Sequence, residues 1–200
     1  MMWSTTKERD AGVFADRLGT LEHTLSKCAR LFFGGHLMKK IGIVMGSRSD
    51  LPIVQKAMDT LRELGIDFEV HIFSAHRTPQ QARDFALAAR ERGFGAIIAA
   101  AGMAAHLAGA IAANTTLPVI GIPCKGPYLD GIDALLSTVQ MPSGIPVATV
   151  AINAGTNAAL LCAQILAVTE PELAAKLDEM RAKAAAAILE QDRELAQSIQ

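Results

Sequence analysis

The sequence predicts an α/β fold with a parallel sheet of about five strands, and three observations support this prediction. From residue 38 onward, short apolar runs alternate with longer segments of helical periodicity. The first run, residues 41–45, is apolar throughout, as in strands that are covered on both faces. Alanine is abundant and the chain has only seven Phe, one Tyr and one Trp, which suits helices packed closely on a sheet.

The first helix of this alternation is expected at 51–64, directly after a polar turn. Asp50 is a favourable residue at a helix start, Pro52 suits the first turn, and Gly65 suits a C-terminal cap. Residues 68–73 then alternate as a strand does. The same signals predict the later elements, which are helices at 78–92, 104–113, 130–140, 156–168 and 171–198 and strands at 96–100, 118–122 and 147–152.

The last helix differs from the others because Glu, Lys, Arg and Asp alternate with its alanines. Its larger apolar residues recur at helical spacing and form one stripe, which we expect to pack on a neighbouring subunit. The residues of this stripe are Leu173, Leu177, Met180, Ala184, Ile188 and Leu195. No repeat or low-complexity linker divides residues 38–200, so we expect a single domain there.

Residues 1–37 form a leader of different character, in which we expect no domain. It lacks the ordered charged, apolar and small-residue regions of a signal peptide. Met38 stands directly before the first strand, and the glycines at 34–35 could be encoded by a ribosome-binding sequence read in frame. The leader is then a mis-assigned start; alternatively it is a mobile or partner-binding segment, because residues 11–31 have some helical periodicity.

Charge and cysteine content exclude several classes of partner. The formal net charge is -1 at pH 7, which gives no electrostatic case for nucleic acid or an anionic membrane surface. The three cysteines lie far apart without a C-x-x-C pair, so we expect no zinc site and a cytoplasmic location. The most apolar segment, 94–113, is broken by Gly102, His106 and Gly109, and we interpret it as a buried strand, a loop and a buried helix.

Right-handed crossovers place every strand-to-helix loop of a parallel sheet at its carboxyl edge, where open α/β folds bind ligands. Four loops should therefore meet there, at residues 46–50, 74–78, 101–106 and 123–131. The first turns from an apolar strand into Gly-Ser-Arg-Ser-Asp, so that backbone N–H groups at a helix start could receive an anion. Neither a dinucleotide-binding glycine pattern nor a P-loop can be built from it.

The second loop contains the strongest chemical signal, His76 followed by Arg77. A histidine titrates near neutrality and can transfer protons, while an arginine fits phosphate or carboxylate. A lone histidine is more often structural, but the adjacent arginine and the polar loop opposite favour catalysis. His106 in the third loop has two interpretations, a second proton carrier or hydrogen-bond donor, and a capping or core residue.

Other polar residues near this edge have simpler explanations. Lys125 is interpreted as a solvated loop charge rather than an anion contact, and Asp130 and Asp133 as acids at a helix start. Cys124 has no neighbour that would lower its pKa. A metal held by the two loop histidines would need a third ligand, and none stands out, so no metal is expected.

Five motifs carry a resemblance to a known family: GSRSD at 46–50, SAHRTP at 74–79, AAGMAAHLAG at 100–109, QMPSGIPVATVAI at 140–152 and NAALLCAQIL at 157–166. Together they resemble the class I N5-carboxyaminoimidazole ribonucleotide mutases of bacterial purine biosynthesis. They occur in collinear order from Lys39 to about Leu177. The Arg of SAHR and the AAH triplet resemble the mutases rather than the related carboxylases that use free carbon dioxide.

The resemblance implies a cofactor-free enzyme with a flavodoxin-like three-layer sandwich, usually an octamer. Such an enzyme moves a carboxylate from an exocyclic nitrogen to ring carbon 4 of an aminoimidazole ribonucleotide. By resemblance, His76 handles the proton. The substrate-binding positions that the resemblance implies are Ser47, Asp50 and Arg77 for the nucleotide and Ser74, Gly102 and His106 around the base and carboxylate.

Two positions depart from the family pattern. Many members have Gly-Gly where this chain has Gly102-Met103, and Pro where it has Ala108. The Met103 side chain either narrows the carboxylate pocket or points into the core. Two other functions stay open at this point: a carboxylase that uses free carbon dioxide on the same fold, and a non-catalytic nucleotide-binding module.

Overall fold

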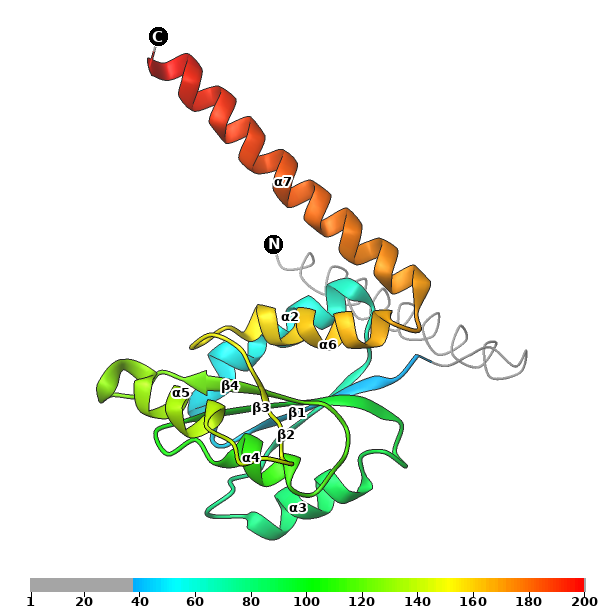
Figure 1. Cartoon of the computed structure of the whole chain (residues 1–200), viewed down its shortest axis with the longest axis vertical. Helices are drawn as coiled ribbons and strands as arrows, with labels where there is room; N and C mark the ends of the chain where they lie inside the picture. The colour runs from blue at the N-terminus through cyan, green and yellow to red at the C-terminus, as the bar shows by residue number, and fades with distance from the viewer. Residues whose placement is uncertain (1–37, 200) are drawn as a thin grey trace, which may run out of the picture. The chain divides into compact units, whose positions relative to one another are not determined.

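The structure is a computed structural model and describes residues 38–199 (Figure 1). The predictions for the leader, residues 1–37, lie outside the described residues. Within the described part, five parallel strands form one sheet in the order β2-β1-β3-β4-β5, which is the flavodoxin-like order. The strands are β1 (Lys40–Met45), β2 (Phe68–Ile72), β3 (Phe94–Gly102), β4 (Val119–Cys124) and β5 (Ala148–Thr149). The predicted fold class is confirmed.

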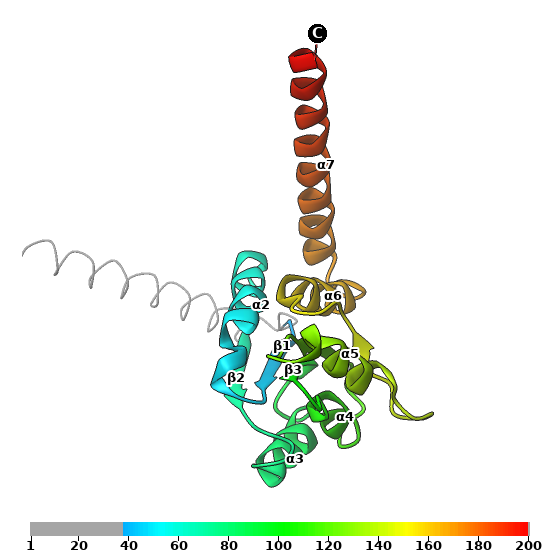
Figure 2. The same cartoon turned by 90° about the vertical axis from the view of Figure 1, so that its left-hand side faces the viewer.

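Helices cover both faces of the sheet, which gives the three layers (Figures 1 and 2). α2 (Leu51–Leu64) and α6 (Gly155–Ala167) lie on one face. α3 (Pro79–Ala88), α4 (Leu107–Ala112) and α5 (Ile132–Val139) lie on the other. A Cβ atom on Gly155 would lie 2.2 Å from the carbonyl oxygen of Ile53, so only glycine allows α6 to approach α2 this closely.

The middle of the sheet is fully buried. Ile41, Ile43 and Val44 of β1 and Ile97 and Ile98 of β3 have no exposed surface. The apolar segment at 94–113 is, as predicted, a buried strand, a loop and a helix. No helix in the described range, 38–199, is long and apolar enough to cross a membrane.

Element boundaries differ from the predictions where neighbours decide them. β3 is longer than predicted because it pairs with β1 on one side and β4 on the other. β5 is shorter because it is an edge strand that pairs with β4 only through Ala148 and Thr149. α3 ends at Ala88 rather than at 92, and a turn closed by Gly93, with φ +82°, leads into β3.

α7 (Pro171–Ile199) is the long C-terminal helix that was predicted. Its first turns contact the rest of the fold, because Leu173 is buried and Lys176 Nζ donates to the carbonyl oxygen of Leu64 at 3.1 Å. Every residue of α7 from 181 to 199 is exposed, including Ile188 and Leu195 of the predicted stripe. The expected packing on another subunit stays a prediction.

Candidate active site

The four loops predicted to meet at the carboxyl edge line one cavity of about 610 Å³. It is large enough for a nucleotide-sized ligand by the usual range of small-molecule sites. All seven residues singled out from the sequence line it. They are Ser47, Asp50, Ser74, His76, Arg77, Gly102 and His106. Their roles stay predictions, but the structure brings every one of them to the same cavity.

The first wall is a single 3₁₀ turn, Arg48–Asp50, that links β1 to α2. Ser47 Oγ accepts a hydrogen bond from the Ser49 amide at 3.2 Å, and Asp50 Oδ2 accepts one from the Ser47 amide at 3.0 Å. This is a capping box, whose S-x-x-D spacing was visible in the sequence. Two of the N–H groups expected to be free for an anion are therefore already bonded.

Asp50 is a buried acidic residue. Only 9% of its surface is exposed, and this burial raises the pKa of its carboxyl group. The hydrogen bond from the Ser47 amide and the positive charge of Arg77 both lower the pKa and partly oppose the effect of burial. The carboxylate is thus positioned by the backbone and lies within the electrostatic influence of an arginine from the neighbouring loop.

The second wall is a tight turn at 74–78 that presents His76 and Arg77 to the cavity. Thr78 Oγ1 accepts a hydrogen bond from the Ser74 amide at 2.8 Å, and Ser74 Oγ accepts one from the Arg77 amide at 3.2 Å. Arg77 Nη2 donates to the carbonyl oxygen of Gly46 at 3.1 Å. Arg77 therefore joins the loops that follow β1 and β2.

The third wall brings His106 to His76. His76 Nε2 and His106 Nδ1 lie 2.9 Å apart, and the ring planes are inclined by 76°. Both residues are exposed, and His106 makes no capping bond at the start of α4, so the structure rejects the capping and core interpretations. One hydrogen lies between the two nitrogens, so the tautomer of one imidazole sets that of the other.

One of the two departures from the family pattern, Met103, belongs to this wall, and the other, Ala108, lies in the helix that follows it. Met103 lines the cavity with 54% of its surface exposed, so it does not point into the core. Ala108 is buried in α4, 2% exposed. Gly102 lies close to β4, since a Cβ there would be 3.1 Å from the carbonyl oxygen of Cys124.

The fourth wall comes from residues 125–127, after β4. Lys125 lines the cavity and its Nζ lies 2.7 Å from Asp130 Oδ1, so it is paired rather than only solvated. This hydrogen bond lowers the pKa of Asp130. Asp130 lies in a 3₁₀ turn with φ 50° rather than in the first turn of α5, where Asp133 does lie.

Neither thiolate chemistry nor a metal centre is indicated in the described region. Cys124 is buried, and burial with the nearby negative charge of Asp50 raises its pKa to about 12. It therefore stays a thiol at neutral pH. Among residues 38–199, no three His, Cys, Asp or Glu side chains gather closely enough to hold a metal ion.

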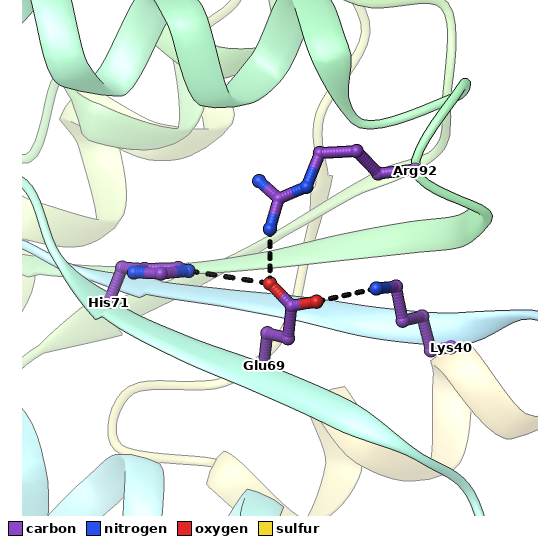
Figure 3. A network of polar contacts seen from close by, with 4 residues as sticks. All are labelled: Lys40, Glu69, His71 and Arg92. Atoms are coloured by element: carbon purple, nitrogen blue, oxygen red, sulfur yellow. Dashed lines mark hydrogen bonds and ion pairs between the residues drawn. The ribbon is translucent and has the colours of Figure 1, made fainter.

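A charged cluster around Glu69, the Glu69 cluster, lies outside the cavity and consists of Lys40, Glu69, His71 and Arg92 (Figure 3). Glu69 receives hydrogen bonds from Lys40 and Arg92, and its Oε2 lies 3.6 Å from His71 Nε2. The His71 ring stacks on Phe73, with centroids 4.9 Å apart and planes inclined by 7°. His71 lies in a strand and does not line the cavity, so its place agrees with a structural role.

Comparison with known proteins gives consistent matches. The family model described as AIR carboxylase matches residues 40–187. The N5-carboxyaminoimidazole ribonucleotide mutase of Thermotoga maritima is 51% identical over 160 residues, which are 80% of this chain and 94% of that protein. The mutase of the same name from Bacillus subtilis is 50% identical over 157 residues, 78% of this chain and 97% of that protein.

A second group of relatives is named differently. The phosphoribosylaminoimidazole carboxylase of Saccharomyces cerevisiae is 52% identical over 143 residues, which are 72% of this chain but only 25% of the yeast protein. Among solved structures, PurE of Treponema denticola has a TM-score of 0.70 and 30% identity, covering 78% of this chain and 97% of that chain. A variant of the PurE2 protein of that organism has a TM-score of 0.72 and 28% identity, covering 80% and 99%.

Proposed function

This chain belongs to the AIR carboxylase family, and from that premise we propose that it is an N5-carboxyaminoimidazole ribonucleotide mutase of purine biosynthesis. Two relatives of that name match over 94% and 97% of their own length, whereas the yeast carboxylase matches over only 25%. The observation that carries the chemistry is the His76–His106 pair, 2.9 Å apart, in a cavity that also holds Arg77 and Asp50. The enzyme is then an isomerase.

The reaction moves a carboxylate without any external reagent. The bond between the exocyclic nitrogen and the carboxylate carbon breaks, its electron pair stays with the nucleotide, and carbon dioxide forms. Ring carbon 4 then bonds to that carbon dioxide and loses its proton, while the exocyclic nitrogen gains one. The electron-rich ring needs proton transfer and water exclusion rather than an electron sink, so the proposal requires no cofactor.

His76 is the group we assign to the proton transfer. Its ring is exposed in the cavity, where a substrate can reach it, and it is bonded to His106 rather than to a carboxylate. That bond couples the tautomer of His76 to the tautomer of His106. His106 is thus both a contact for the substrate carboxylate and a partner that keeps the imidazole of His76 oriented.

The remaining site residues are assigned to substrate binding. Arg77 is suited to the phosphate because its guanidinium offers several donors in a fixed plane. Asp50 is suited to a ribose hydroxyl, and Ser47 lies beside it in the same capping box. Ser74 and Gly102 complete the walls around the base and the carboxylate.

We extend the proposal to a cytoplasmic homo-octamer with one domain per subunit, residues 38–200. Exposed apolar side chains in the described protomer support self-association. On α5, Ile132, Leu136 and Val139 are 51%, 53% and 47% exposed at helical spacing, and α7 exposes its own stripe. Sedimentation of the full chain and of a chain that starts at Met38 tests the octamer and the single domain. A monomer would contradict the octamer, and a Met38 chain that does not fold would contradict the domain bounds.

The deciding experiment supplies two substrates separately, without ATP. We expect turnover of N5-carboxyaminoimidazole ribonucleotide and little turnover of aminoimidazole ribonucleotide with free carbon dioxide. The opposite preference would establish the carboxylase function of the yeast relatives instead. His76→Asn should keep nucleotide binding and lose turnover; if no activity exists in the wild type, the chain is a binding module.

A further inference from the structure

The cavity has a permanent positive charge on each of two opposite sides. Among the described residues that line it, the two lysine or arginine residues are Arg77, in the loop after β2, and Lys125, directly after β4. β1 and β3 lie between these two strands, so the loops that follow β1 and β3 separate the two cations. A ligand that crosses the cavity can therefore place one anionic group at each side.

Hydrogen bonds fix the backbone of Lys125 beside the third wall of the cavity. The Lys125 amide donates to Asn153 Oδ1 at 2.8 Å, and the Asn153 amide donates to the carbonyl oxygen of Pro123 at 2.9 Å. The preceding residue, Cys124, is paired with Gly102 at the end of β3. Lys125 therefore starts from a fixed point next to the loop that carries the second histidine of the site.

Asp130 is the partner of the Lys125 ammonium group in the described protomer. Their atoms Nζ and Oδ1 lie 2.7 Å apart, and the two side chains are 55% and 82% exposed. Leu129, Asp130 and Gly131 all have left-handed backbones, with φ 52°, 50° and 91°, and a Cβ on Gly131 would lie 3.1 Å from Lys125 Cα. The chain thus turns back against Lys125. Water screens such an exposed ion pair, so an anionic ligand can replace Asp130.

We propose that Lys125 binds the carboxylate of the substrate and gives up its ion pair with Asp130 to do so. The proposal rests on the mutase function, whose substrate and product each carry a phosphate on the ribose and a carboxylate on the base. The assigned contacts follow the order of the strands: Arg77 for the phosphate after β2, Asp50 for the ribose after β1, and His106 for the carboxylate after β3. Lys125, after β4, comes next to His106 in this order.

This role predicts which kinetic constant changes. When the bond between the nitrogen and the carboxylate carbon breaks, the negative charge stays with the nucleotide and carbon dioxide is neutral. Lys125 therefore stabilises the bound substrate more than the transition state. Lys125→Met should raise KM by roughly 10-fold, as expected for a lost hydrogen bond to a charged group, without lowering kcat. Lys125→Arg keeps the positive charge and should keep KM within a few-fold of the wild type.

The deciding measurement is calorimetric titration with two nucleotides. One is the product, which carries the carboxylate on ring carbon 4, and the other is aminoimidazole ribonucleotide, which has none. Lys125→Met should bind the product about 10-fold more weakly and bind aminoimidazole ribonucleotide as the wild type does. Asp130→Asn releases Lys125 and should bind the product several-fold more tightly. This gain should vanish in the double variant, because Asp130 acts only through Lys125.

An ion pair outside the cavity is the matched control. Lys183 and Glu179 of α7 lie 2.8 Å apart, with side chains 75% and 64% exposed, and neither lines the cavity. Lys183→Met and Glu179→Gln change the net charge of the protein exactly as the two test variants do. Both should bind both nucleotides as the wild type does. Equal changes in the control and test variants would attribute the effect to net charge and overturn the role of Lys125.

The other outcomes separate this proposal from the mutase function. Equal weakening of both nucleotides in Lys125→Met would make Lys125 a phosphate contact, and unchanged affinity for both would remove it from the site. Either result would overturn the proposal while wild-type turnover keeps the mutase function. A wild type that shows the expected affinities without turnover would overturn the mutase reaction alone. A wild type that binds neither nucleotide would overturn both.

Discussion

The described histidines lie in two environments. His76 and His106 face each other in an open cavity, and among residues 38–199 no ion pair joins either to a carboxylate. His71 lies on β2 against Phe73, beside a glutamate that Lys40 and Arg92 already neutralise (Figure 3). An imidazole held by stacking and charge is part of the fold, whereas one held only by another imidazole can exchange a proton with a ligand.

Substituting one histidine from each environment should give the largest difference in kcat. His76→Asn should lower kcat by roughly 10²- to 10⁴-fold, because general acid–base catalysis contributes about that much, and should leave nucleotide binding nearly unchanged. His71→Asn should keep kcat within a few-fold. Steady-state assays with binding by calorimetry measure both. Equal losses in the two variants would show that the comparison is wrong.

Arg77 sharpens the comparison because it lines the cavity and has no contact with the described residues around Glu69. Arg77→Lys should weaken nucleotide binding by about 10- to 100-fold, as a lysine cannot reproduce a two-pronged contact worth ~1.5–3 kcal/mol. Arg83→Lys, at an exposed position of α3, is the control and should bind as the wild type does. Titration of the nucleotide by calorimetry gives both affinities. An unchanged affinity in Arg77→Lys would remove it from the phosphate site.

The Glu69 cluster should affect stability without affecting catalysis. The hydrogen bond from Lys40 is the main cause that lowers the pKa of Glu69 from its ordinary value of 4.5. A lowered folded-state pKa stabilises the fold above pH 4.5, and this stabilisation is lost as pH falls through the folded pKa. Glu69→Gln should therefore cost about 1 kcal/mol at pH 7 and almost nothing in acid.

Urea unfolding at both pH values, with an activity assay at pH 7, measures this effect. Asp59→Asn breaks a more exposed pair with Arg62 and is the control, expected to change stability by less than about 0.5 kcal/mol. If Glu69→Gln lost catalytic activity at pH 7 while Asp59→Asn kept it, the Glu69 cluster would not be independent of the cavity.

Asp50 should give the smallest effect, with the opposite sign. Burial raises the pKa of Asp50, so the folded state holds the proton more tightly than the unfolded state does. Its ionisation then disfavours folding as pH rises through the folded pKa. Asp50→Asn should therefore gain a little stability relative to the wild type as pH rises from about 4 to about 7. A relative loss over this range in thermal melts would contradict the assignment.

The sequence predicted the position of the site well and its internal contacts poorly. Parallel strands end at one edge, so polar residues after consecutive strands had to meet there, and all seven do. The His76–His106 contact depends on β1 lying between β2 and β3, and an apolar run does not reveal strand order. The direction of Met103 depends on a single backbone angle that no pattern encodes.

The exposed part of α7 has a consequence for measurements on the assembled protein. Residues 181–199 are exposed in the described protomer, and helices in proteins gain most of their stability from packing against other elements. Their amide hydrogens should therefore exchange with deuterium faster than those of the packed helices in a lone protomer. Slow exchange of residues 181–199 would show that another protein surface packs against α7. Hydrogen exchange of this segment therefore measures association of the protomers.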